Sequence, residues 1–148
     1  RIRELMPHAC IGADVIVGFP TETDEYFRQS YDFIESLDLS YLHVFTYSER
    51  ENTPAAEMGV SVPPAVRAAR SRALHRLGEK KRAAFYLRHQ GQVREVLLES
   101  ENKEGWMFGF TDNYIKVRLP YDPHLVGTLQ AVRLGPQVED GLLDASLL

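Results

Sequence analysis

The chain has 148 residues, a formal net charge of −4, a hydrophobic fraction of 44% and a single cysteine, Cys10. This length suits one ordinary domain or two small ones. No run approaches the ~18 apolar residues of a bilayer span, so we expect no membrane interaction. One cysteine excludes an internal disulfide and cannot hold an iron–sulfur cluster alone, and it favours a cytoplasmic location.

Although the net charge of the chain is negative, one segment is strongly basic. Residues 67–94 contain nine basic side chains against the single acid Glu79, a formal charge of +8, so the remainder carries −12. Such asymmetry favours a polyanionic partner for one region, although a solvated helix face is the alternative interpretation. The basic residues are Arg67, Arg70, Arg72, Arg76, Lys80, Lys81, Arg82, Arg88 and Arg94.

The first half of the chain predicts a βαβ unit over residues 12–47. Residues 13–19 are almost all apolar, as in a parallel strand covered on both faces. Residues 21–25 supply caps and acids for a helix start. The apolar residues of 27–37 recur at helical spacing, and residues 41–47 are rich in aromatic and β-branched types, which favours a second strand.

A loop over residues 48–64 separates this unit from a long basic helix. The loop is marked by prolines and Gly59 and has no sustained periodicity. The helix is predicted from Pro63 or Pro64 to about His89. We expect its basic residues to lie largely off the buried stripe, which we assign to Val66, Ala69, Ala73 and Leu77.

Beyond Gln92 the periodicity changes to two, and five short strands predict a small barrel. Trp106, Phe108 and Phe110 share a face, which we interpret as core. Tyr114, Lys116 and Arg118 share another, and this mixture suits single-stranded RNA because rings stack on bases while cations meet phosphates. The expected strands are 93–99, 106–111, 114–119, 127–134 and 142–148.

The carboxyl ends of the two parallel strands are the candidate ligand site of the first half. Ligands of α/β proteins sit at such ends, and Gly18 lets a ligand approach the backbone closely. A turn that merely ends the strand is the alternative. His43 suits a general base, but a hydrogen-bonded structural histidine is commoner in a strand. We identify no catalytic triad, paired carboxylates or metal-ligand cluster, and therefore no catalytic or metal residue.

Three stretches resemble the radical S-adenosylmethionine methylthiotransferase family: DVIVGFPTET, HVFTYSERENTPA and VPPAVRAARSRALHRLGEKKRAAF. HVFTYSER with FTDNYIKV is most similar to the branch that acts on threonylcarbamoyladenosine in tRNA. The resemblance implies an α/β plus all-β fold, in which the C-terminal part of a radical SAM partial TIM barrel is joined by a helix to a small TRAM-type β-barrel. The implied domains are residues 1–62 for the radical SAM part, 63–89 for the basic linker helix and 90–148 for the RNA-binding TRAM-like barrel.

The resemblance also implies partners and site residues. Whole enzymes of this family use S-adenosylmethionine and two [4Fe–4S] clusters, and their RNA partner is the tRNA anticodon stem-loop. The implied cofactor-binding residues are Ile16, Gly18, Phe45, Thr46 and Tyr47. The expected RNA-binding residues are Arg67, Arg70, Lys80, Lys81, Arg82, Arg88, Arg94, Tyr114, Lys116 and Arg118.

Two departures from the family pattern shape the functional expectation. The chain lacks the family's CxxxCxxC motif, and Thr21 replaces the second glycine of GFPGET. Because the chain also begins without methionine, we interpret it as a C-terminal part that binds no cofactor, is inactive alone and retains RNA binding. The alternatives are a stand-alone RNA-binding module and a methylthiotransferase acting on a ribosomal protein. Exposed strands of residues 12–47 predict self-association.

Overall fold

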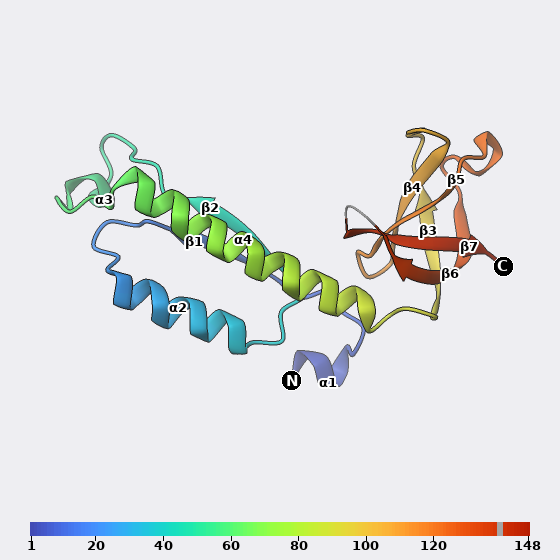
Figure 1. The fold of residues 1–148 in the computed structure, drawn as a ribbon, viewed down its shortest axis with the longest axis horizontal. Coiled ribbons are helices and arrows are strands. Elements are labelled where there is room, and N and C mark those ends of the chain that lie inside the picture. The colour runs from blue at the N-terminus through green and yellow to red at the C-terminus, as the bar shows by residue number, and fades with distance from the viewer. Residues whose placement is uncertain (139–140) are drawn as a thin grey trace. The chain divides into compact units, whose positions relative to one another are not determined.

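The fold was analysed in a computed structural model that describes residues 1–138 and 141–148. The chain forms two compact units (Figure 1). We call residues Ile11–Arg82 the sheet–helix unit. The barrel unit comprises two separate segments, Arg1–Cys10 and Ala83–Leu148, so the chain passes between the units twice.

The sheet–helix unit contains the predicted βαβ element. Strand β1 (Gly12–Val17) pairs in parallel with β2 (Tyr41–Thr46), and helix α2 (Asp24–Ser36) connects them. The Thr23 hydroxyl caps the N-terminus of α2, where it accepts a hydrogen bond of 3.1 Å from the Tyr26 amide. The helices pack on one face of this sheet, where the buried residues Val17, Ile34, Leu74 and Leu77 form the core.

Helix α4 (Pro64–Leu87) is the predicted long helix, and Leu77 is buried as predicted, but the rest of the buried stripe lies one residue beyond the predicted one. Arg67, Arg70, Leu74 and Leu77 are buried, whereas Ala69 is exposed. Two of the basic residues therefore lie in the interior, contrary to our expectation that they would avoid the buried stripe. Further along, α4 contributes Phe85 and Tyr86 to the core of the barrel unit.

Two short helices were not predicted. Helix α3 (Pro54–Glu57) interrupts the loop of residues 48–64, and the Thr53 hydroxyl caps it through the Ala56 amide at 3.3 Å. Helix α1 (Ile2–Leu5) lies in the N-terminal segment of the barrel unit. Each forms a single turn, which is too short to produce a helical hydrophobic period.

Five strands form the closed barrel that the sequence predicted (Figure 1). The strand order is β3-β4-β5-β7-β6, with β5 and β7 parallel and the other pairs antiparallel. A short 3-10 turn, η1 (Pro123–Leu125), precedes β6. The strand bounds are β3 (Val93–Leu98), β4 (Trp106–Thr111), β5 (Lys116–Pro120), β6 (Leu129–Gln137) and β7 (Leu143–Leu147).

The aromatic face of β4 is only partly buried, contrary to the prediction: Phe108 is buried, at 8% exposure, but Trp106 and Phe110 are not. Within the described residues, the barrel core takes Met107 from this strand, and the ring of Phe108 is covered from outside by Lys116. Trp106 and Phe110 are partly exposed. The interior face is completed by Gly109, where a Cβ would fall on the Leu97 carbonyl oxygen and 2.5 Å from Val96 Cγ1. Met107 therefore supplies the interior side chain of this strand.

Thr21 adopts a left-handed backbone conformation, with φ of 71°. A β-branched residue is strained there, whereas glycine is not. We expect Thr21→Gly to stabilise the chain by about 1 kcal/mol, because the relieved strain exceeds the entropy lost by glycine. Urea unfolding measures this change. Thr21→Ala is the matched control, since it retains a Cβ, and an equal gain in that variant would contradict the strain explanation.

Candidate nucleic-acid interface and cofactor face

The exterior of β4 and β5 gathers rings and cations. In the β4–β5 register Phe110 opposes Lys116 and Phe108 opposes Arg118. Lys116 Nζ lies 5.4 Å from the centroid of the Phe108 ring, and Arg118 Cζ lies 4.4 Å from that of Trp106. We call the following set the outer aromatic–cation face: Trp106, Phe108, Phe110, Tyr114, Lys116 and Arg118.

The position of Tyr114 corrects one detail of the prediction. It precedes β5, in a turn with φ of 65°, instead of continuing the strand face of Lys116 and Arg118. Its ring nevertheless contacts this face, at 5.8 Å from the Phe110 ring centroid. Tyr114 is 70% exposed, so one side of an aromatic ring is presented to solvent beside two cations.

Two of the predicted RNA-binding arginines of the barrel unit, Arg94 and Arg118, pair with carboxylates. Arg118 Nε donates to Asp144 Oδ1 at 2.7 Å. Arg94 donates to Gln92 Oε1 at 2.9 Å and forms a longer ion pair of 3.4 Å with Asp112. Arg88 is exposed at the end of α4, with its guanidinium 5.9 Å from the Phe85 ring centroid. Partial pairing orients these cations while leaving them near the surface.

Three predicted RNA-binding residues lie in the C-terminal half of α4, within the sheet–helix unit. Lys81 Nζ donates to the carbonyls of Glu35 and Leu37 at 3.0 and 2.7 Å, and so caps the C-terminus of α2. Burial lowers the pKa of Lys81. Lys80 forms an exposed ion pair with Glu35 at 3.3 Å, and Arg82 is exposed.

Arg67 is buried at the carboxyl end of both strands. Its guanidinium donates to the carbonyls of Val62 and Tyr47 at 2.7 and 3.0 Å and forms an ion pair with Glu49. Hydrogen bonding to Arg67 lowers the pKa of Glu49 to about 2. These bonds tie the residues after β2 to α4, so the structure gives Arg67 a bracing role.

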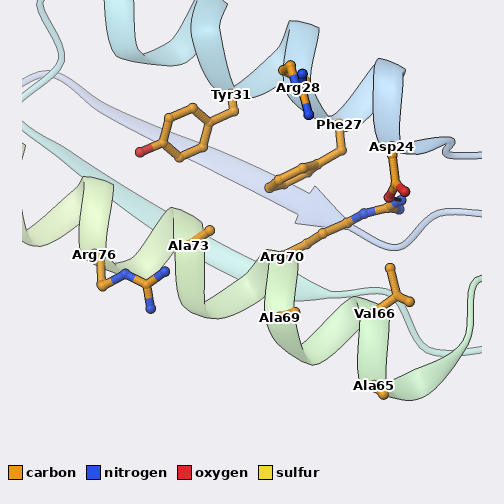
Figure 2. A pocket seen from close by; sticks show the side chains of 10 residues that line it. All are labelled: Asp24, Phe27, Arg28, Tyr31, Ala65, Val66, Ala69, Arg70, Ala73 and Arg76. Carbon is orange, nitrogen blue, oxygen red and sulfur yellow. Dashed lines mark hydrogen bonds and ion pairs between the residues drawn. The ribbon is translucent and has the colours of Figure 1, made fainter.

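Arg70 has a corresponding role at the end of β1. Figure 2 shows its side chain extending from α4 past Phe27 toward Asp24. Its guanidinium pairs with Glu22 and Asp24, each at 2.6 Å, and Glu22 accepts the Gly18 amide at 2.8 Å. Beside it, Ala65, Ala69 and Ala73 help line an open groove of about 650 Å³ between α2 and α4 (Figure 2).

The other face of the β1–β2 sheet is open. Ile16 and Phe45 are adjacent in the register and are 57% and 52% exposed. Asp14 and His43 form the next exposed pair of neighbours, and the His43 ring stacks on Phe45 with centroids 6.3 Å apart. This apolar pair with a neighbouring aromatic ring fits the flat, partly apolar adenine group of S-adenosylmethionine.

The remaining predicted cofactor residues have contacts within the chain. The Tyr47 amide donates to the Val17 carbonyl at 2.8 Å, and its own carbonyl accepts from Arg67. Gly18 has φ of 77°, and a Cβ there would fall on Arg67 Cγ, so packing explains this glycine without a ligand. Thr46 is exposed at the end of β2. Among the described residues, the Tyr47 hydroxyl is buried without a hydrogen-bond partner.

Iron–sulfur ligation does not fit the donor set of this chain. A [4Fe–4S] cluster takes three or four thiolates, and Cys10 is the single cysteine. Residues 1–138 and 141–148 contain no group of three or more His, Cys, Asp or Glu side chains placed to hold a metal ion. In the same residues, no helix has both the length and the apolar character needed to cross a bilayer.

Comparison with curated proteins identifies relatives along most of the chain. It is 43% identical over 119 residues, 80% of its length, to the threonylcarbamoyladenosine tRNA methylthiotransferase of Rickettsia prowazekii. The corresponding enzyme of Bacillus subtilis is 36% identical over 138 residues. The tRNA-2-methylthio-N(6)-dimethylallyladenosine synthase of Bacillus subtilis is 33% identical over the full chain. The chain spans 27–31% of the length of these relatives, and no protein-family profile matches it.

Proposed function

This chain belongs to the radical S-adenosylmethionine methylthiotransferase family, and from that premise we propose that it is the RNA-holding, C-terminal part of a tRNA methylthiotransferase. The observation that carries the proposal is the outer aromatic–cation face, which combines stacking rings with oriented cations. We further propose threonylcarbamoyladenosine beside the anticodon as the substrate nucleoside. Its support is the higher identity to enzymes named for that nucleoside, 36–43%, against 33–35% for enzymes named for dimethylallyladenosine.

We propose that the chain consists of three segments with different functions. We propose that residues 1–62 belong to the radical SAM barrel, residues 63–89 are the linker helix and residues 90–148 are the TRAM-like RNA-binding barrel. The first ten residues of the radical SAM segment nevertheless pack in the barrel unit. Helix α4 falls within the linker, and the five strands of the closed barrel fall within the last segment. A cytoplasmic location accords with a tRNA substrate.

In the whole enzyme, S-adenosylmethionine and two [4Fe–4S] clusters supply the radical and sulfur-transfer chemistry. We propose that Ile16 and Phe45 contact its adenine ring, with Gly18, Thr46 and Tyr47 at the same strand ends; the support is that Ile16 and Phe45 are exposed neighbours in the register. The cluster thiolates come from outside this chain, because Cys10 is its single cysteine. The chain alone is therefore proposed to be inactive in methylthio transfer.

Binding to an anticodon stem-loop RNA, titrated against salt, tests the RNA proposal. Trp106 is the single tryptophan and lies in the proposed face, so its fluorescence reports binding there. We expect quenching by RNA and a slope of log K against log salt of about −3 or steeper, which corresponds to about four phosphates of single-stranded RNA. No binding at low salt would overturn the proposal.

We also propose that the open face of β1–β2 drives self-association of the isolated chain. Exposed Ile16 and Phe45 form an apolar patch, and a two-stranded sheet has unpaired edges. Light scattering across a concentration series is expected to show a dimer that Phe45→Ser weakens. A monomer at every concentration would contradict this proposal without affecting RNA binding.

A further inference from the structure

A cavity of about 510 Å³ lies in the barrel unit, between the N-terminal segment and the turn that joins β4 to β5. His8 and Cys10 line it from one side, and Arg94, Asp112 and Tyr114 from the other. Its volume lies within the range of about 300–1,000 Å³ typical of small-molecule sites. We propose that it holds one unstacked nucleotide of a bound RNA, with the base against Tyr114 and the phosphate beside Arg94. This inference rests on the proposed function.

The walls of the cavity are held by internal hydrogen bonds. Asn113 Nδ2 donates to the His8 carbonyl at 3.0 Å, which joins the β4–β5 turn to the N-terminal segment. The Thr111 hydroxyl donates to Asn113 Oδ1 at 2.7 Å and accepts the Ile115 amide at 2.9 Å. On the other side, the His8 ring packs edge-on against His89. The cavity is thus preformed, which reduces the ordering cost of binding.

Tyr114 supplies the stacking surface. The braced turn holds its ring 70% exposed, and Phe110 supports the ring at 5.8 Å. Sequence-specific RNA recognition uses unstacked bases on aromatic side chains in this way. Tyr114 also belongs to the outer aromatic–cation face, so an RNA strand crossing Lys116 reaches the cavity without leaving the barrel surface.

The charges at the cavity favour a phosphate in one position. Arg94 is largely covered, and its ion pair with Asp112 is long, at 3.4 Å, while Asp112 is itself exposed. Solvent around the exposed Asp112 carboxylate screens this long ion pair, so it holds the guanidinium only weakly. A phosphate therefore competes readily with Asp112 for the guanidinium. It follows that Asp112 weakens RNA binding, although it lies beside the proposed contact.

The first test removes the ring without disturbing the turn. Asparagine tolerates the left-handed conformation of residue 114, so Tyr114→Asn retains the fold. With an anticodon stem-loop RNA as probe, we expect Tyr114→Asn to weaken binding about tenfold and to leave the salt slope unchanged, because no charge is lost. Tyr114→Phe retains the ring and is expected to restore affinity. Tyr26→Ala removes another exposed tyrosine, on α2, and serves as the control.

The second test uses Cys10, which lines the cavity and is the single cysteine. Saturating RNA is expected to slow its alkylation by iodoacetamide at least threefold in the unmodified chain but not in Tyr114→Asn. Asp112→Asn is expected to raise RNA affinity about threefold.

The outcomes separate the two proposals. RNA binding with the expected salt slope, but with no effect of Tyr114→Asn and no protection of Cys10, would overturn the nucleotide subsite and leave the RNA-binding function intact. Loss of affinity in Tyr26→Ala equal to that in Tyr114→Asn would also overturn the subsite. Absence of RNA binding in the salt titration would overturn both.

Discussion

Replacing Arg70 by alanine is expected to destabilise the chain by about 3 kcal/mol, since breaking a buried ion pair leaves an uncompensated charge. The Arg70 side chain is 6% exposed and its partner Glu22 is 15% exposed. The substitution also removes the contact of the guanidinium with the Phe27 ring. Urea unfolding followed by circular dichroism measures the effect.

Two further variants isolate the cause of this loss. Arg72→Ala removes an exposed arginine from the same helix and is expected to change stability by less than about 0.5 kcal/mol. Adding Glu22→Gln to Arg70→Ala is expected to recover part of the loss, because it neutralises the stranded carboxylate. Equal effects of Arg70→Ala and Arg72→Ala would contradict the buried-pair explanation.

Removing both cations of the outer aromatic–cation face is expected to reduce RNA affinity about twentyfold at 0.1 M salt. Each phosphate contact on single-stranded RNA contributes about 0.7 to the salt slope, so the double variant Lys116→Ala with Arg118→Ala flattens the slope by about 1.4. Lys116 lies over Phe108 and Phe110, and Arg118 over Trp106, so the rings remain in place to report residual stacking. The Trp106 fluorescence titration measures both quantities.

An arginine on another strand of the barrel unit provides the control for net charge. Arg133 is exposed on β6, which pairs with neither β4 nor β5, and it lies outside the outer aromatic–cation face. Arg133→Ala is expected to change the salt slope by clearly less than removal of Lys116 or of Arg118 alone does. If Arg133→Ala changed the slope as much as the loss of one face cation, the face would have no special part in binding.

The sequence was sufficient to predict the order and type of the long elements. Period two and period 3.6 distinguish the five barrel strands from α4, and both patterns appear in the structure within a few residues. Periodicity does not say which face of a strand points inward. On β4 the aromatic face suggested the core, but the crowding at Gly109 leaves room for Met107 instead.

At the candidate site, too, the sequence did not reveal the roles of individual arginines. Charge counting grouped Arg67 and Arg70 with the RNA-binding residues, yet each pairs with an acid far away in sequence: Glu49 and Glu22 are 18 and 48 residues distant. A buried arginine and an exposed one have the same sequence signature until their partners are known. Likewise, the pair Arg118 and Asp144 joins two strands that are not consecutive in the chain.

The divided barrel unit has a consequence for synthesis on the ribosome. The contact between His8 and Asn113 spans 105 residues, and the intervening chain includes the whole sheet–helix unit. At roughly 5–20 residues per second, His8 is made about 5–20 s before its partner. The N-terminal segment, which carries exposed Ile2, Leu5 and Met6, docks only after that delay. The cavity between these two segments therefore forms only after the whole sheet–helix unit has been synthesised.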